Sequence, residues 1–233
     1  MMCGGVRTVL LILCLVWVQN ALAQEGSVSI ALKGNLTTSS RLFTDPNSPD
    51  MFERSQYLAL QDFFGYGVEL RYQIPESNIA LGLSADYIRA KNDRSITIVS
   101  TVVPIENGYR VVPVELTGYF LIPLSGPTFG VYMGGGVGAY FGAGVYKVGD
   151  TEAPTTSTEN GYGIHVLGGV SYRFTSWFSL EAEMKFRDLQ FKTSNHFASS
   201  TVIYKDVVVP VEPLDASIHT DGVVFQLGTV FNF

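Results

Sequence analysis

The chain has 233 residues, of which 46% are hydrophobic and only 15% are charged, and it contains 24 glycines. Its formal net charge of −6 at pH 7 gives no reason to expect a nucleic-acid partner. The two cysteines, Cys3 and Cys14, both lie near the amino terminus, so the remainder of the chain offers no disulfide and no thiolate metal ligand.

The amino end has the composition of a secretory signal peptide. Arg7 precedes an apolar run over residues 9–18, and Ala21-Leu22-Ala23 supplies small residues at 21 and 23, as a signal peptidase requires. The apolar run is short for a transmembrane helix, which needs about 20 such residues. We therefore expect residues 1–23 to be removed before Gln24. One exported domain then remains, residues 24–233, whose net charge is −6 less the single positive charge of Arg7, or −7.

The exported part alternates apolar and polar residues with a period of two, which is typical of β-strands. The last run ends on an aromatic carboxy terminus, so in lipid its sheet must close onto the first strand, because unpaired backbone groups there cost several kcal/mol each. We therefore predict an all-β protein, an eight-stranded antiparallel transmembrane β-barrel. The eight predicted strands contain residues 28–33, 65–74, 79–90, 109–122, 129–142, 161–174, 177–188 and 222–233.

The fifth predicted strand contains the glycine-rich run 134–138, which by itself is compatible with a phosphate-binding loop. No helical pattern follows this run, and the alternation of apolar and polar residues continues through it. The sequence therefore favours a barrel strand with glycines on its inner face.

The connections between the predicted strands alternate between short and long, as periplasmic turns and extracellular loops do. This alternation places both termini on the periplasmic side. Two segments within the long loops, 95–105 and 201–211, are themselves β-prone, and Asn107-Gly108 is a good hairpin turn. They predict either strand extensions above the membrane or separate hairpins, and a ten-stranded barrel is the alternative to eight strands. The short connections are 75–78, 123–128 and 175–176, and the long ones are 37–63, 91–108, 143–160 and 189–221.

Aromatic residues gather near both predicted rims, as expected for the two membrane interfaces. The periplasmic set is Tyr72, Phe174, Trp177, Phe178, Phe231 and Phe233, and the outer set is Tyr87, Tyr109, Phe141, Tyr162, Phe186 and Phe225.

The signal peptide, the eight alternating strands, the short and long loops and the ending Val230-Phe231-Asn232-Phe233 together resemble the small OmpA-type and OmpX-type outer-membrane β-barrel proteins. The resemblance covers essentially all of the exported chain and depends on architecture rather than on one motif. It implies residence in a bacterial outer membrane of the Gram-negative type. It also implies that Phe231 and Phe233 form the signal recognised by the outer-membrane assembly machinery.

Charged residues within the predicted strands stand at positions that face the lumen. The exceptions are Arg89, Arg110 and Asp188 at the outer strand ends, where an outward-facing charge lies near the membrane interface and costs little. The inward set holds five charges of each sign. It could form an ion path, but an eight-stranded barrel is only wide enough for its own side chains to fill it, so a neutral plug is favoured. This predicted lumenal charge network contains Lys33, Glu69, Arg71, Asp86, Glu115, Arg173, Glu181, Glu183, Lys185 and Arg187.

Catalysis in a small barrel needs a histidine working beside a serine or carboxylates near the outer rim. His165 has the lumenal phase, and we expect it to hydrogen-bond to a neighbouring carboxylate. No local spacing matches a known dyad, so we predict no catalytic, cofactor-binding or metal site. The remaining candidates lie in the longest loop, namely His196, His219, Ser199, Ser200, Asp206, Asp215 and Asp221.

A short pattern, Val-Val-Pro followed by an aliphatic residue and Glu, occurs at 102–106, 111–115 and 208–212. All three copies lie at or near the outer end of the barrel. They could form a projecting sheet edge that pairs with a partner's strand. Ordinary strand extension, in which proline limits edge pairing, is the favoured interpretation.

The sequence therefore predicts an integral outer-membrane protein with a charge-plugged lumen and a structural or surface-binding role. Binding is expected at the outer loops, chiefly 189–221 and 91–108, because these loops are longer than the connection of barrel strands requires. One alternative is a passive channel for small or apolar solutes, since the inner faces of the fifth and sixth strands are rich in glycine. A lipid-modifying enzyme or protease of the outer membrane is another. The expected partners are membrane lipid, lipopolysaccharide, the assembly machinery and an extracellular ligand.

Overall fold

The computed structural model describes residues 27–98, 100–123, 126, 128–220 and 222–233. The expected signal peptide and its cleavage point before Gln24 lie outside these described residues. Nearly all of the described chain is β-strand, and its one described helix is α2 (Met51–Arg54). Among the described residues, no helix is long and apolar enough to cross a membrane.

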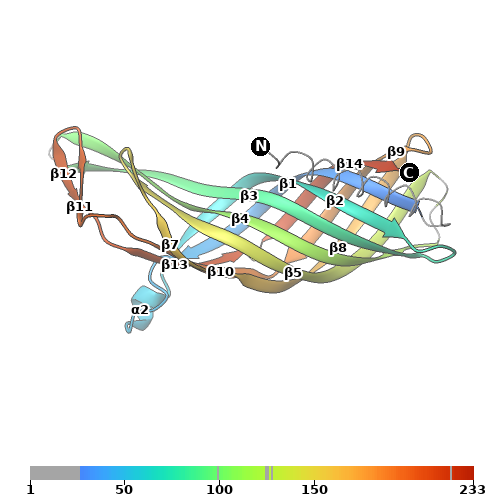
Figure 1. The fold of residues 1–233 in the computed structure, drawn as a ribbon, viewed down its shortest axis with the longest axis horizontal. Helices are drawn as coiled ribbons and strands as arrows, with labels where there is room; N and C mark the ends of the chain where they lie inside the picture. The colour runs from blue at the N-terminus through green and yellow to red at the C-terminus, as the bar shows by residue number, and fades with distance from the viewer. Residues whose placement is uncertain (1–26, 99, 124–125, 127, 221) are drawn as a thin grey trace, which may run out of the picture.

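Eight long strands form a closed antiparallel ring in the order β14–β9–β8–β5–β4–β3–β2–β1, and β1 then pairs with β14 (Figure 1). The closing pair runs in continuous register from Ser29 opposite Asn232 to Thr37 opposite Val224. The predicted eight-stranded barrel is confirmed, and the ten-stranded alternative is wrong. The ring contains β1 (Ser27–Phe43), β2 (Tyr57–Gln73), β3 (Ile79–Ile98), β4 (Thr101–Leu121), β5 (Phe129–Val148), β8 (Gly161–Arg173), β9 (Phe178–Arg187) and β14 (Val223–Asn232).

The barrel wall is apolar outside and polar inside, the reverse of a soluble protein. On β9 the side chains of Leu180 and Met184 are exposed, whereas those of Glu181 and Glu183 between them are buried. A wall with this pattern is stable only when lipid covers its outer face. The glycine-rich run 134–138 lies within β5, so the strand interpretation of that run is confirmed.

Aromatic rings form clusters at the periplasmic end, where the short turns and the carboxy terminus lie. The rings of Trp177 and Phe231 stack with centroids 6.3 Å apart, and Phe174 lies 5.8 Å from Phe178. Near the outer end, Tyr66 and Tyr87 are 5.5 Å apart on adjacent strands. Rings at both ends match the two interfaces of a bilayer.

Tyr109 corrects the predicted outer belt, because its side chain is fully buried inside the barrel. It lies on β4 an even number of residues from Glu115, which also faces inward, so the two side chains share one face of the strand. The Tyr109 hydroxyl lies 3.1 Å from the Thr220 hydroxyl.

The long connections are largely continuations of the barrel strands. Residues 95–98 and 101–105 extend β3 and β4 well beyond the closed ring, and the two strands remain paired up to Ile98 and Thr101. The expected turn at Asn107-Gly108 is wrong, since both residues pair within the ladder, with Asn92 and Lys91 respectively. The long hydrogen-bonded ladder within the barrel sets the register of β3 and β4. The local turn preference of Asn107-Gly108 does not override that register.

Short strands complete the outer part of the wall. β13 pairs with the upper end of β1, and β10 and β7 follow in the order β1–β13–β10–β7. Segment 201–211 instead forms a separate hairpin, whose turn residues Lys205 and Asp206 both have positive φ, as type I′ turns require. The short strands are β6 (Thr151–Ala153), β7 (Thr155–Glu159), β10 (Leu189–Asn195), β11 (Thr201–Tyr204), β12 (Val207–Pro210) and β13 (Leu214–Thr220).

The β11–β12 hairpin packs against the tips of β3, β4 and β5 at the end of the molecule opposite to the carboxy terminus (Figure 1). We call this unit, residues 95–98, 101–105, 146–148 and 197–211, the head. Val103 and Val209, from two of the three Val-Val-Pro repeats, meet in its core. The buried residues of the head core are Val103, Val148, Val202, Val209 and Val211, with Ile98, Ile105, Tyr146, Phe197, Tyr204 and Val207 packed around them.

The closed ring predicts heat-modifiable electrophoretic mobility. An unboiled detergent sample should migrate differently from a boiled one, because a closed hydrogen-bonded sheet resists SDS until it is heated. Circular dichroism on the unboiled sample should show a β spectrum. Equal mobility together with a random-coil spectrum would rule out the barrel.

A second prediction separates folding from assembly at the carboxy terminus. The Phe233 N–H donates to the Val28 carbonyl over 2.9 Å, while its ring is exposed on the outer face. Phe233→Ala keeps this backbone bond, so refolding of the purified protein in detergent should be unchanged. Its level in the outer membrane of cells should fall if the ring is an assembly signal. Phe225→Ala, which removes an exposed ring from β14, is the matched control and should leave that level unaltered.

Candidate functional site

Two clusters of charged side chains lie inside the barrel. The lower cluster, near the periplasmic end, contains Lys33, Glu69, Arg71, Glu181 and Glu183. The Lys33 Nζ lies 2.5 Å from a Glu69 oxygen and 2.7 Å from a Glu183 oxygen. The Arg71 guanidinium donates to Glu69 over 2.9 Å and to Glu181 over 3.2 Å. Each charge in this cluster therefore has an opposite charge in contact, as a confined ion requires.

Glycines beside Lys33 make room for this arrangement. The residues opposite Lys33 on its two neighbouring strands are Gly67 and Gly228. A Cβ at Gly228 would lie only 3.1 Å from the Lys33 stem and 3.2 Å from Glu181. The long side chain can cross the lumen because neither neighbour projects into it.

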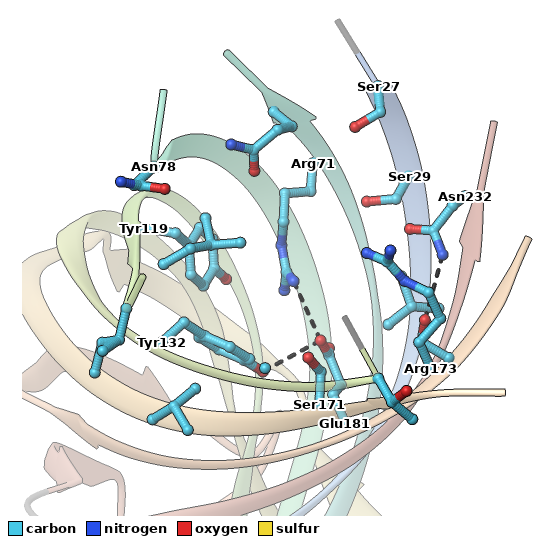
Figure 2. Close-up of a pocket in the computed structure, with 18 of the residues that line it drawn as sticks. Ser27, Ser29, Arg71, Asn78, Tyr119, Tyr132, Ser171, Arg173, Glu181 and Asn232 are labelled. Carbon is cyan, nitrogen blue, oxygen red and sulfur yellow. Dashed lines mark hydrogen bonds and ion pairs between the residues drawn. The ribbon is translucent and has the colours of Figure 1, made fainter. Parts of the chain in front are cut away.

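Two tyrosines cover the periplasmic side of the lower cluster (Figure 2). The Arg71 guanidinium lies 4.2 Å from the centre of the Tyr119 ring, a cation–π contact. The Tyr132 hydroxyl donates to Glu183 over 2.9 Å and to Glu181 over 3.2 Å. The Tyr132 ring occupies the space beside Gly169, where a Cβ would meet it at 2.6 Å.

The upper cluster contains Asp86, Glu115, Lys185 and Arg187. The Lys185 ammonium donates to Glu115 over 2.9 Å. The Arg187 guanidinium donates to Asp86 over 2.8 Å and to Glu115 over 3.1 Å. All four residues are buried, so this cluster is a balanced set of two cations and two carboxylates.

His165 lies next to the upper cluster, but its contact differs from the expected one. Its Nε2 lies 2.9 Å from the Thr117 hydroxyl, so the expected carboxylate partner is wrong. The carboxylate of Glu115 is engaged instead by the two stronger cationic donors, Lys185 and Arg187.

Arg173 is the member of the predicted network that lies outside both clusters. Eight of the ten predicted residues are buried and Arg71 is partly exposed, whereas Arg173 is exposed at the periplasmic mouth. It lines a pocket of about 380 Å³ with mixed polar and apolar walls, together with Asn232 and, at the inner end, Arg71 and Glu181 (Figure 2). The lower cluster therefore contains two cations and three carboxylates, and the fifth predicted cation faces the periplasm.

An apolar layer above the charges was missed by sequence analysis, because most of its residues lie in the predicted loops. The Phe191 ring fills the space over Gly142 on β5, where a Cβ would collide with it. An irregularity at Asp62, whose φ is 52°, turns Leu60 inward. The period-two pattern of 189–195 could have indicated this layer, whereas the buried residues Leu60 and Phe63 of β2 are three residues apart and break that period. It contains Leu42, Leu60, Phe63, Ile88, Ala90, Tyr109, Val111, Tyr140, Leu189, Phe191, Ala216 and Ile218.

The candidate catalytic residues of the longest loop are dispersed. His196, Ser199 and Ser200 are exposed between β10 and β11, Asp206 lies in the β11–β12 turn, and Asp221 lies outside the described residues.

Ser217, which sequence analysis missed, lies with its hydroxyl oxygen 3.0 Å from the His219 Nε2. The two alternate on β13, a spacing that could have indicated the contact. Asp215, on the same face, accepts a hydrogen bond from Ser194. Within the described residues no three histidine, cysteine or carboxylate side chains gather as a metal site would require.

The closed ring, its apolar outer face and its charged interior define the class of small transmembrane β-barrels. The chain belongs to the family described as "Outer membrane protein beta-barrel domain", whose profile matches residues 8–205. No curated protein sequence matches the chain.

Three solved structures with similar folds are outer-membrane or surface proteins. OprG from Pseudomonas aeruginosa has a TM-score of 0.56 and 13% identity, covering 90% of this chain and 96% of that one. A major outer membrane protein from Thermus thermophilus has a TM-score of 0.53 and 12% identity, covering 88% and 99%. Neisserial surface protein A (NspA) has a TM-score of 0.50 and 13% identity, covering 90% and 100%. At these identities the similarity shows the fold alone.

Charge reversal inside the barrel should be far more damaging than reversal on a loop. Arg187→Glu would place a third carboxylate beside Asp86 and Glu115, and breaking a buried pair typically costs about 3 to 5 kcal/mol. Asp45→Lys, at an exposed loop position, should change the free energy of unfolding by no more than about 0.5 kcal/mol. Urea unfolding in detergent, monitored by tryptophan fluorescence, measures the free energy of unfolding of both variants. Similar effects of the two variants would contradict the pairing in the upper cluster.

Proposed function

We propose that the protein is a sealed, non-enzymatic outer-membrane barrel that binds an extracellular ligand through its head. The single observation that carries this proposal is the separate hydrophobic core of the head. Five buried valines from three distant parts of the chain form that core. Burying each valine contributes roughly 1.5 kcal/mol or more, so the head is a stable structure rather than a set of flexible loops.

The barrel itself has no need of this head. The ring closes through β1 and β14, and the connections at the periplasmic end are short, whereas the outer strands continue into an additional hairpin. Ordered segments that the scaffold does not require are commonly the functional ones.

The outer face of the β11–β12 hairpin is the best surface for such binding. Ile203 and Val208 lie directly opposite each other and are 73% and 58% exposed. Exposed apolar groups on an ordered surface commonly mark interaction sites. Pro210 limits pairing at the edge of β12, so contact through side chains is favoured over addition of a partner strand.

The two charge clusters and the apolar layer above them support a sealed lumen. The glycine-rich inner faces of β5 and β8, which favoured a solute channel, are occupied by Tyr132 and Phe191. The pocket of about 380 Å³ at the periplasmic mouth is the observation that favours the channel alternative. We further propose export by a signal peptide, residues 1–23, and insertion by the outer-membrane assembly machinery.

Removal of the hairpin tests the binding proposal. Replacing residues 198–211 with a short Gly-Ser turn should preserve heat-modifiable mobility, because no ring strand is altered. The adhesion of intact expressing cells to an array of glycans and extracellular proteins should be lost. The control shortens the loop 45–55, which contains α2 but contributes nothing to the head core. Adhesion that survives hairpin removal, or that disappears only in the control, would contradict the proposal.

Planar-bilayer recording tests the sealed lumen. Purified wild-type protein should give no stable single-channel current, because the paired charges and the apolar layer leave no continuous aqueous path. Stable currents from the wild type would favour the channel alternative instead.

A further inference from the structure

A group of outward-facing basic residues lies on β3 and β4 at the outer rim of the barrel. Arg89 and Arg110 are directly opposite each other in the β3–β4 register. Both are exposed, and the Arg89 side chain is 52% exposed. Lys91 lies two residues beyond Arg89 on the same face of β3, so three cations face one small area.

Contacts within the protein explain only part of this arrangement. Like charges directly opposite each other destabilise a sheet. Glu106 contacts Arg89 over 2.9 Å, but among the described residues no carboxylate lies within ion-pair distance of Arg110. Lys91 contacts Asp93 over 2.9 Å, and this hydrogen bond raises the pKa of Lys91, so the lysine keeps its charge. The two arginines thus retain a net positive charge.

The arginines lie immediately beyond the lipid-facing surface. Tyr87, two residues below Arg89, contacts Tyr66, and Val112, two residues below Arg110, lies opposite Phe141. Two residues of a tilted strand correspond to roughly 5 Å along the barrel axis. The guanidinium groups therefore lie just above an aromatic belt, at the depth of lipid headgroups.

The strands β2 and β9 do not carry this charge, although β1 and β10 hold the exposed cations Arg41 and Lys192 farther up the outer wall. The chain as a whole has a net charge of −6, and the ionisable residues at a comparable level on β2 and β9 are the exposed carboxylates Asp62 and Asp188. Among these strands, the positive charge at the level of Arg89 and Arg110 therefore lies over β3 and β4.

We propose that Arg89 and Arg110 bind a phosphate group of an outer-leaflet glycolipid, namely lipid A in the lipopolysaccharide of the outer membrane. Guanidinium groups bind phosphate oxygens through paired N–H donors, and the adjacent apolar and aromatic side chains contact the acyl chains. The proposal depends on the membrane placement of the barrel and not on the function of the head, so the two can fail separately.

Native mass spectrometry of the folded full-length protein in detergent tests the proposal. Lipid A carrying its phosphates should bind, and the same lipid after enzymatic dephosphorylation should bind much more weakly. Arg89→Gln with Arg110→Gln should weaken binding of the phosphorylated lipid by about 25-fold, since each cation near an anionic headgroup contributes about fivefold. The control Lys205→Gln removes an exposed cation from the head and should have no effect.

Three outcomes would overturn the proposal. Equal binding of phosphorylated and dephosphorylated lipid A would show that only the acyl chains are recognised. Unchanged binding by the double arginine variant, with its heat-modifiable mobility intact, would place the lipid elsewhere. Displacement of lipid A by an equal concentration of inorganic phosphate would indicate a general anion site instead of a lipid site.

Discussion

The closure of β14 onto β1 is the interaction on which the rest of the structure depends. In lipid there is no water to satisfy backbone N–H and C=O groups, so a sheet can span the membrane only as a ring without edges. Closure leaves one face of every strand against lipid and the other in a narrow lumen. Since successive side chains alternate, polar residues have no position within the membrane except the interior. The charged interior is therefore a direct consequence of the hydrogen-bonding requirement of the backbone.

A narrow interior imposes its own requirement, because charges removed from water need partners. Lys33 contacts carboxylates from two other strands, and Arg187 bridges Asp86 and Glu115. Glycines on the inner faces give these long side chains and the large rings the space they occupy. Above the charges the interior changes from ion pairs to a packed apolar layer. A lumen filled in these two ways supports the proposal of a sealed barrel.

In the outer part of the molecule the strands do not face lipid, so they need not form one closed ring. β3 and β4 continue as one long hairpin, whereas β11 and β12 form a small sheet that packs against its tip. The same β3–β4 pair carries Arg89 and Arg110 opposite each other on its outer face. One hairpin thus contributes to the lipid-facing wall, to the core of the head and to the proposed lipid A site.

The sequence by itself determined the fold class, the number of spanning strands and the direction of most of their side chains. Period-two alternation records whether each residue faces lipid or lumen, and that information is local. It did not determine which lumenal charges meet: Lys33 and Glu183 are 150 residues apart, and their contact depends on the register around the whole ring. Nor did the sequence determine the partner of His165 or the position of Arg173. Both depend on how far along the barrel axis each side chain lies relative to the charge clusters. The extent of β3 and β4 above the membrane was also decided by tertiary structure, since the head core stabilises strands whose local sequence is equally compatible with a loop.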